Sequence, residues 1–231
     1  MTSPFDGYEW VDLSHILEED IPAYHTHARF GKTLYESYEY GDAARHYGLT
    51  MSEHTGTHMD APLHFISEGP AHYGTDEIPL ECLAGRAATI EATDLGADDL
   101  LGVRRIEAWE EEHGPIEAAD RVLIRYGWDR RWATGPEGRR FLEDWPGLSG
   151  EAAEYLVGKG VSLVGCDTLA VDATVSTENP AHYALLGSEV YIVENLKNLD
   201  RLPSFCFFLA YPLKIKGGSG SPVRAVALVA R

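Results

Sequence analysis

One twelve-residue segment restricts the fold most strongly, because it gathers ionisable groups around residues that disfavour a helix. The segment HTGTHMDAPLHF, residues 54–65, holds three imidazoles and one carboxylate. Thr55, Gly56 and Thr57 are poor helix formers, and Pro62 follows closely. We therefore expect extended or bulged backbone here, in which side chains two residues apart project to the same side.

This extended backbone predicts a cation site. His58 and Asp60 would point to one side, and the conformational freedom of Gly56 would let the chain curl until His54 joins them. Two neutral imidazoles and a carboxylate at one point are typical donors for a divalent metal. His64 is near enough to act as a base or as a further ligand, and the sequence leaves both roles open.

The rest of the chain predicts a mixed α/β fold that is rich in strands and forms one domain over residues 1–231. Apolar runs predict strands at 8–13, 85–91, 121–126, 161–166, 189–194, 204–211 and 223–229. Helices are predicted over 97–114 and 149–158, the second with Ser149 as its N-cap. Residues 14–50 show no clear periodicity and predict a long loop or a mixed segment.

Composition narrows the class of protein. The net charge is −18, from 19 basic and 37 acidic residues, and such a surface repels nucleic acid and anionic lipid. No stretch approaches the roughly 18 apolar residues of a membrane helix. The acidic start MTSPFDGYEWVDLSH does not resemble a secretory signal. We expect a cytoplasmic protein that binds a small molecule.

The cysteines and the outlying histidines are expected to be structural. Three widely spaced cysteines do not describe a disulfide framework or a CxxC metal site, and their apolar neighbours predict buried, reduced thiols. These are Cys82, Cys166 and Cys206. Surface positions are expected for His15, His25, His27, His46, His72 and His113.

The segment HTGTHMDAPLHF resembles the hallmark of the metal-dependent cyclase family, which contains bacterial kynurenine formamidases and isatin hydrolases. Ordered blocks along the chain resemble the same family: VDLSH (11–15), DRVLIRYGW (120–128), GVSLVGCDTLAVD (160–172), VENLKNLDRLP (193–203) and PLKIKGGSGSPVRAVA (212–227). The resemblance implies a swivelling β/β/α domain, a homo-oligomer, most simply a dimer, and hydrolysis of a C–N amide bond. The substrate would be an N-formyl aryl amide or a cyclic amide.

The resemblance also implies a role for each residue of the metal site. His54, His58 and Asp60 would hold a first metal, and Asp60 would bridge to a second. His182, in NPAHYALLG, would bind the second metal, and Glu194, in YIVENL, would bridge both. With no cysteine among these donors, the site suits one or two Zn²⁺ or Mn²⁺ ions per chain.

Two further residues would act on the substrate. His64 would donate and accept the proton, as an imidazole can near neutral pH. Tyr24 stands where formamidases place an aromatic residue, usually Trp, against the substrate. The chain departs from the family both at Tyr24 and in the following residues 25–27, where His-Thr-His replaces the usual Pro-Gly-Asp turn. Both departures concern the choice of substrate rather than the metal.

Other functions are weighed against this one. His58, Asp60 and His182 could form the two-histidine, one-carboxylate triad of a non-haem iron oxygenase, but that leaves His54 and His64 unexplained. A metal-binding or small-molecule-binding module without catalysis is a further alternative. The glycine-rich stretch GGSGSP (217–222) lacks the context of a phosphate loop or a serine nucleophile, and we expect a structural loop near the site.

Overall fold

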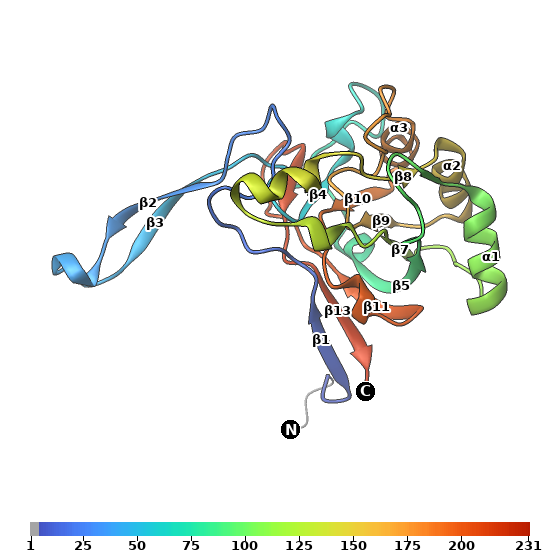
Figure 1. Cartoon of the computed structure of the whole chain (residues 1–231), viewed down its shortest axis with the longest axis horizontal. Helices are drawn as coiled ribbons and strands as arrows, with labels where there is room; N and C mark the ends of the chain where they lie inside the picture. Colours follow the sequence, from blue (N-terminus) through green and yellow to red (C-terminus); the bar gives the residue numbers. More distant parts are fainter. Residues whose placement is uncertain (1–4) are drawn as a thin grey trace.

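The computed structural model describes residues 5–231, and most of its strands form one curled sheet (Figure 1). The strand order is β1-β13-β11-β5-β7-β9-β10-β4-β12. The bounds are β1 Tyr8–Asp12, β4 His58–Asp60, β5 Ala84–Glu91, β7 Arg121–Arg125, β9 Leu163–Cys166, β10 Tyr191–Glu194, β11 Phe205–Leu209, β12 Gly220–Pro222 and β13 Val226–Ala230. Strands β5, β7, β9 and β10 run parallel, and the others pair antiparallel. The predicted mixed α/β fold is confirmed.

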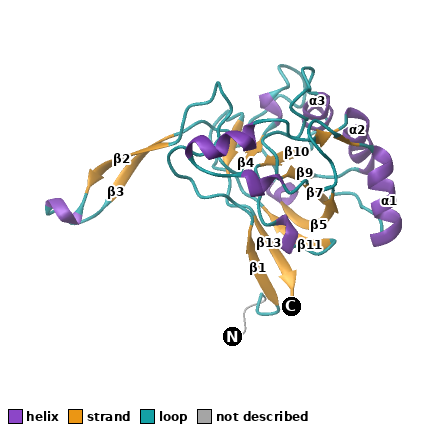
Figure 2. Ribbon diagram, in the orientation of Figure 1, coloured by secondary structure: helices purple, strands orange, loops and turns teal. Residues whose placement is uncertain are grey.

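The parallel strands are apolar on both faces because both faces are covered. In β7, Val122 and Ile124 face one core, while Leu123 faces the other, with Met59 and Phe208. Three helices contribute to the first core: α1 Val103–His113, α2 Gly150–Lys159 and α3 Pro180–Gly187. Figure 2 shows them gathered on one side of the sheet. Strands β10, β4 and β12 form one end of the sheet, and the candidate site lies there.

The first predicted helix starts later than the sequence suggests. It begins at Val103 rather than residue 97, because Asp98 has a positive φ of 59° and the Asp99 carboxylate accepts a hydrogen bond from Gly96 N–H. The fully buried Leu101 lies instead in the short strand β6, Leu100–Leu101, which pairs with β8, Gly147–Leu148. The second helix has the predicted cap: the Ser149 hydroxyl accepts from Ala152 N–H.

Residues 14–50 contain regular structure that their sequence does not reveal. Strands β2, Gly31–Glu36, and β3, His46–Thr50, form a hairpin. Figure 1 shows this hairpin projecting from the body as an arm. Its side chains are mostly solvent-exposed, including Tyr35, Tyr38 and Tyr40. Since neither face of the ribbon is buried, no apolar alternation marks its strands.

The thiols are reduced as predicted, but they are less uniformly buried. All three are free; Cys166 is buried, whereas Cys82 and Cys206 are partly exposed. In residues 5–231 no helix combines the length and the apolar character that a membrane crossing requires.

Candidate metal centre

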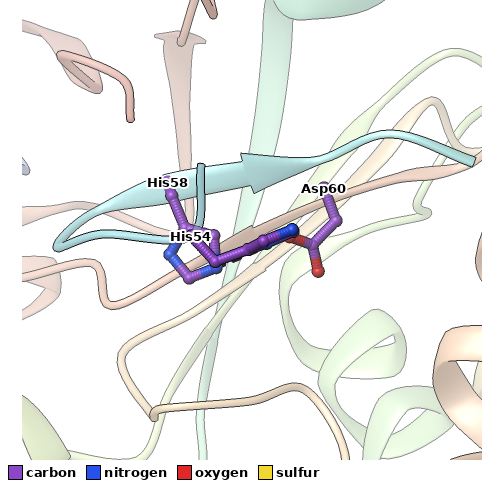
Figure 3. A group of neighbouring side chains, drawn as sticks. All are labelled: His54, His58 and Asp60. Carbon is purple, nitrogen blue, oxygen red and sulfur yellow. Dashed lines mark hydrogen bonds and ion pairs between the residues drawn. The ribbon is translucent and has the colours of Figure 1, made fainter. Parts of the chain in front are cut away.

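Strand β4 places two of the predicted ligands. It lies between β10 and β12, so that His58 stands opposite Glu194 and Asp60 stands opposite Gly220. The preceding turn passes through Gly56, whose φ of 63° belongs to the left-handed region that glycine adopts readily. This turn returns His54 to the side occupied by His58 and Asp60 (Figure 3). The predicted extended backbone is therefore confirmed at β4.

The side chains of five predicted ligands converge at one buried point. His54 Nδ1 lies 2.7 Å from Asp60 Oδ1, and His58 Nε2 lies 3.5 Å from the same oxygen. Glu194 adds Oε2 at 3.4 Å from His58 Nε2 and Oε1 at 3.3 Å from His182 Nε2. His182 Nε2 is also 3.6 Å from Asp60 Oδ2. Two groups of potential ligands result, and Asp60 belongs to both of them.

Helix α3 delivers His182 in its first turn. Asp172 holds that turn, because its carboxylate accepts from the backbone N–H of Ala181 at 2.9 Å and of His182 at 3.0 Å. The same carboxylate lies 2.6 Å from His182 Nδ1. This contact directs Nε2 toward Asp60 and Glu194, as a carboxylate behind a ligand histidine commonly does.

The donor set fits a divalent cation. Ligand atoms about 2.1 Å from a tetrahedral metal lie about 3.4 Å apart. The four separations of 3.3 to 3.6 Å around His58, Asp60, His182 and Glu194 match that spacing. Asp60 Oδ2 is buried and lacks a hydrogen-bond partner within the described residues. Such an oxygen is costly to bury alone, and a cation would satisfy it.

Electrostatics at this point favour positive charge. Burial by itself raises the pKa of Asp60, but His54 and His182 outweigh it and hold that pKa well below the usual range. Burial likewise opposes protonation of His182, yet its contacts with Asp172, Asp60 and Glu194 raise its pKa well above the usual value. The buried carboxylates thus attract cationic partners, and a metal ion competes with protons for the same donors.

A cavity of about 280 Å³ opens above this point. Six of the seven predicted site residues line it: Tyr24, His54, His58, His64, His182 and Glu194. Asp60, the seventh, is 1% exposed and lies beneath them. Tyr24 is 42% exposed, which places it at the rim of the cavity. The structure therefore brings all seven predicted residues to one place.

His64 stands apart from the ligand groups while facing the same cavity. It lies at the end of the 3₁₀ turn Pro62–His64, and its ring stacks on His54 with 4.0 Å between centroids. Among the described residues, neither converging group of ligand atoms includes it. Burial, together with the positive potential of His54 and His182, lowers the pKa of His64 to about 4. The imidazole is therefore neutral near pH 7 and can accept a proton.

Two histidines predicted on the surface, His15 and His27, are only partly exposed. His27 lines the cavity, because the loop after Tyr24 folds its ring to 5.5 Å from that of His54. His15 stacks on Trp132 at 4.0 Å, and burial lowers its pKa to about 3. Both lie in the region whose sequence shows no periodicity, so no pattern indicated these contacts.

Several functional neighbours were also not predicted. Asp172 supports His182, and Asn195 donates from Nδ2 to the carbonyl of Gly56 beside His58. Ser219 contacts His54 from the glycine-rich loop. These residues are distant in sequence from the ligands they support, and no short motif marks them. The loop GGSGSP lies near the site as expected, and the Ser219 side chain makes the contact with His54.

The comparisons with known proteins agree with this geometry. Residues 11–173 match the Cyclase family, described as "Putative cyclase". The kynurenine formamidase of Bacillus thuringiensis is 32% identical over 94% of this chain and 96% of its own. The structure of isatin hydrolase A from Labrenzia aggregata, bound to benzyl benzoate, superposes with a TM-score of 0.90 at 34% identity. The superposition covers 97% of this chain and 95% of the isatin hydrolase chain.

A further solved structure, described as a potential metal-dependent hydrolase with cyclase activity, has a TM-score of 0.75 at 25% identity. The superposition covers 97% of this chain and 99% of the other chain. These findings confirm the resemblance drawn from HTGTHMDAPLHF and the prediction of an enzyme of the hydrolase class. The chain belongs to the Cyclase family, together with isatin hydrolases and bacterial kynurenine formamidases.

Proposed function

We propose that the protein is a metal-dependent amidohydrolase that cleaves the C–N bond of a cyclic or N-formyl aryl amide. One or two Zn²⁺ or Mn²⁺ ions would be held by His54, His58, Asp60, His182 and Glu194. The observation that carries the proposal is the convergence of these five side chains beneath one cavity, where Asp60 Oδ2 has no hydrogen-bond partner within residues 5–231. The similarity to isatin hydrolase and kynurenine formamidase supplies the reaction class.

Two of the ligand histidines have their metal-facing atom set by a neighbouring group. His58 Nδ1 donates to the Gly56 carbonyl at 2.9 Å, and His182 Nδ1 pairs with Asp172, so Nε2 faces the centre in both. When bound, the divalent ions polarise the amide carbonyl and lower the pKa of a water molecule. A donor set of imidazole and carboxylate suits either Zn²⁺ or Mn²⁺.

His64 is proposed as the proton shuttle. Its neutral ring accepts a proton from the attacking water and returns it to the leaving nitrogen. It faces the cavity beside His54, yet it lies outside both groups of converging ligand atoms. This position suits a base better than a ligand, the other role that the sequence allowed.

The lining of the cavity favours an uncharged aromatic substrate. Phe65, Leu169 and Ala170 contribute apolar walls, and Tyr24 stands at the rim. No lysine or arginine is among the described residues that line it. A substrate that carries a carboxylate would find no lysine or arginine side chain to pair with among these lining residues, whereas a neutral planar ring packs against the apolar walls. Tyr24 is therefore proposed to hold the ring of the substrate.

We predict that isatin is a better substrate than N-formylkynurenine, which carries both an ammonium and a carboxylate. The expected ratio of kcat/KM is about tenfold or more, the effect of one poorly paired charged group. Both hydrolyses are followed by absorbance with Zn²⁺ and with Mn²⁺. Turnover of neither compound with either metal would contradict the proposed reaction, and a preference for N-formylkynurenine would contradict the account of the cavity.

We also propose that the chain forms a homo-oligomer, most simply a dimer, through the β2–β3 arm. An isolated two-stranded ribbon is marginally stable, and exposed tyrosines are typical of interfaces. Tyr38 and Tyr40 are 67% and 79% exposed near the tip. Light scattering should give about twice the chain mass, and the double variant Tyr38→Ser, Tyr40→Ser should shift it toward the monomer. A mass that stays near 25.5 kDa at all concentrations would reject the dimer.

A further inference from the structure

The glycine-rich loop at residues 217–221 makes a direct connection to the metal centre that the proposed chemistry does not yet use. Ser219 Oγ lies 3.0 Å from His54 Nε2, the nitrogen on the far side of the ring from Asp60. At Gly220 a Cβ atom would fall 2.5 Å from Cε1 of His54, so a glycine is required there for the ring to fit. The loop therefore packs against one particular ligand.

Glu53 fixes the direction of this hydrogen-bond chain. Its Oε2 atom accepts from the Ser219 hydroxyl at 2.7 Å and from the Ser219 backbone N–H at 3.1 Å. A hydroxyl has one proton, and that proton is given to Glu53. Ser219 Oγ can then only accept from His54, so Nε2 must carry a hydrogen. Nδ1 is left as the atom that faces Asp60 and the other ligands.

The anchoring of the loop makes this arrangement rigid. Gly217 N–H donates to Asp76 Oδ1 at 2.8 Å, and the Gly218 carbonyl accepts from Thr75 N–H at 2.9 Å. The outer nitrogens of the other two ligand histidines are held by a backbone carbonyl and by a carboxylate. His54 differs from both because its partner is a hydroxyl that is itself held by a carboxylate. It also offers Nδ1 rather than Nε2 to the centre.

We infer that Glu53 and Ser219 are positioning residues that fix the tautomer of His54, so that Nδ1 is the metal donor. The inference rests on the proposed metal centre and adds a supporting chain to it. A group that orients a ligand histidine in this way typically accounts for about 10- to 100-fold in metal affinity. The loop GGSGSP thereby acquires a role: it carries the hydroxyl that sets the donor atom of His54.

The test compares variants of the same loop. Ser219→Ala is expected to weaken Zn²⁺ binding about 10- to 100-fold, measured by competition with a chromophoric chelator. Ser219→Thr keeps the hydroxyl and is expected to restore most of the affinity. Ser221→Ala is the matched control, because the Ser221 hydroxyl accepts from Leu213 N–H and donates to the Pro222 carbonyl, away from His54. It should bind Zn²⁺ as the wild type does.

The second readout is the protonation of His54, measured from its imidazole ¹⁵N chemical shifts with and without Zn²⁺. Nε2 should carry a hydrogen in both states of the wild type, and its shift should change in Ser219→Ala. A bare Nε2, an unchanged affinity in Ser219→Ala, or an equal loss in Ser221→Ala would overturn the inference. Failure of the proposed function looks different, since the wild type itself would then bind neither Zn²⁺ nor Mn²⁺ while the ¹⁵N shifts still report the tautomer.

Discussion

Replacing His64 with alanine is expected to lower kcat about 100- to 10,000-fold, the usual contribution of a general acid–base group. The ring faces the cavity and stacks on His54, but it is not part of either converging group of ligand atoms. The His64→Ala variant should therefore keep its metal. Because the wild-type ring must be neutral to accept a proton, the acid limb of the pH–rate profile should also change in the variant.

The matched control is His72→Ala, which removes an exposed histidine whose Nδ1 pairs with the Ile66 carbonyl. This variant should retain both metal and activity. Two results would contradict the account of His64. Loss of metal in His64→Ala would make His64 a ligand, and full activity with full metal content would mean that no proton passes through it.

The sequence predicts the central strands well because burial leaves a strong signal. The observed bounds differ from the predicted ranges by at most three residues at either end for β5, β7, β9, β11 and β13. Each is a short apolar run. Strands β7 and β9 are buried over nearly their whole length, as expected of strands that are covered on both faces, whereas β11 and β13 stay partly exposed. The cap of α2 was predictable for a similar reason, since Ser149 is a typical N-cap residue before a helical pattern.

The missed elements lack such signals. The arm formed by β2 and β3 buries neither face, so exposed tyrosines and charges alternate without a pattern. Helix α3 spans only Pro180–Gly187, and its exposed positions hold Pro180, Tyr183 and Gly187 rather than charged residues, which leaves no polar stripe to identify it. The start of α1 depended on a left-handed turn at Asp98, a local feature that helix propensity does not register.

At the site, local spacing explained the first ligands and long-range contacts explained the rest. His54, His58 and Asp60 follow from an extended chain with a turn at Gly56. Only the family resemblance assigned His182 and Glu194 to the site. The residues of β10 and β4 do not indicate that these two strands pair with each other. Asp172 and Ser219 were missed because a supporting hydrogen bond leaves no spacing rule between distant segments.

Replacing Asp60 with asparagine is expected to remove most of the metal. Asp60 belongs to both groups of ligand atoms and is 1% exposed, so it supplies a charged donor that solvent cannot replace. The amide keeps the shape of the side chain but not its charge, so the fold should persist. We expect metal affinity to fall more than about 100-fold, beyond the effect of removing a group that merely supports a ligand. Asp94→Asn, at an exposed ion pair with Arg105, serves as the control.

The decisive measurement is the metal content of wild type and Asp60→Asn, determined by elemental analysis alongside isatin hydrolysis. The wild type should contain one or two Zn²⁺ or Mn²⁺ ions per chain, lose activity on chelation and regain it when metal is restored without any need for O₂. The Asp60→Asn variant should contain little metal and should stay inactive when metal is added. Undiminished metal in Asp60→Asn, undiminished hydrolysis by metal-free wild type, or a requirement for O₂ would contradict a hydrolytic metal centre at these residues.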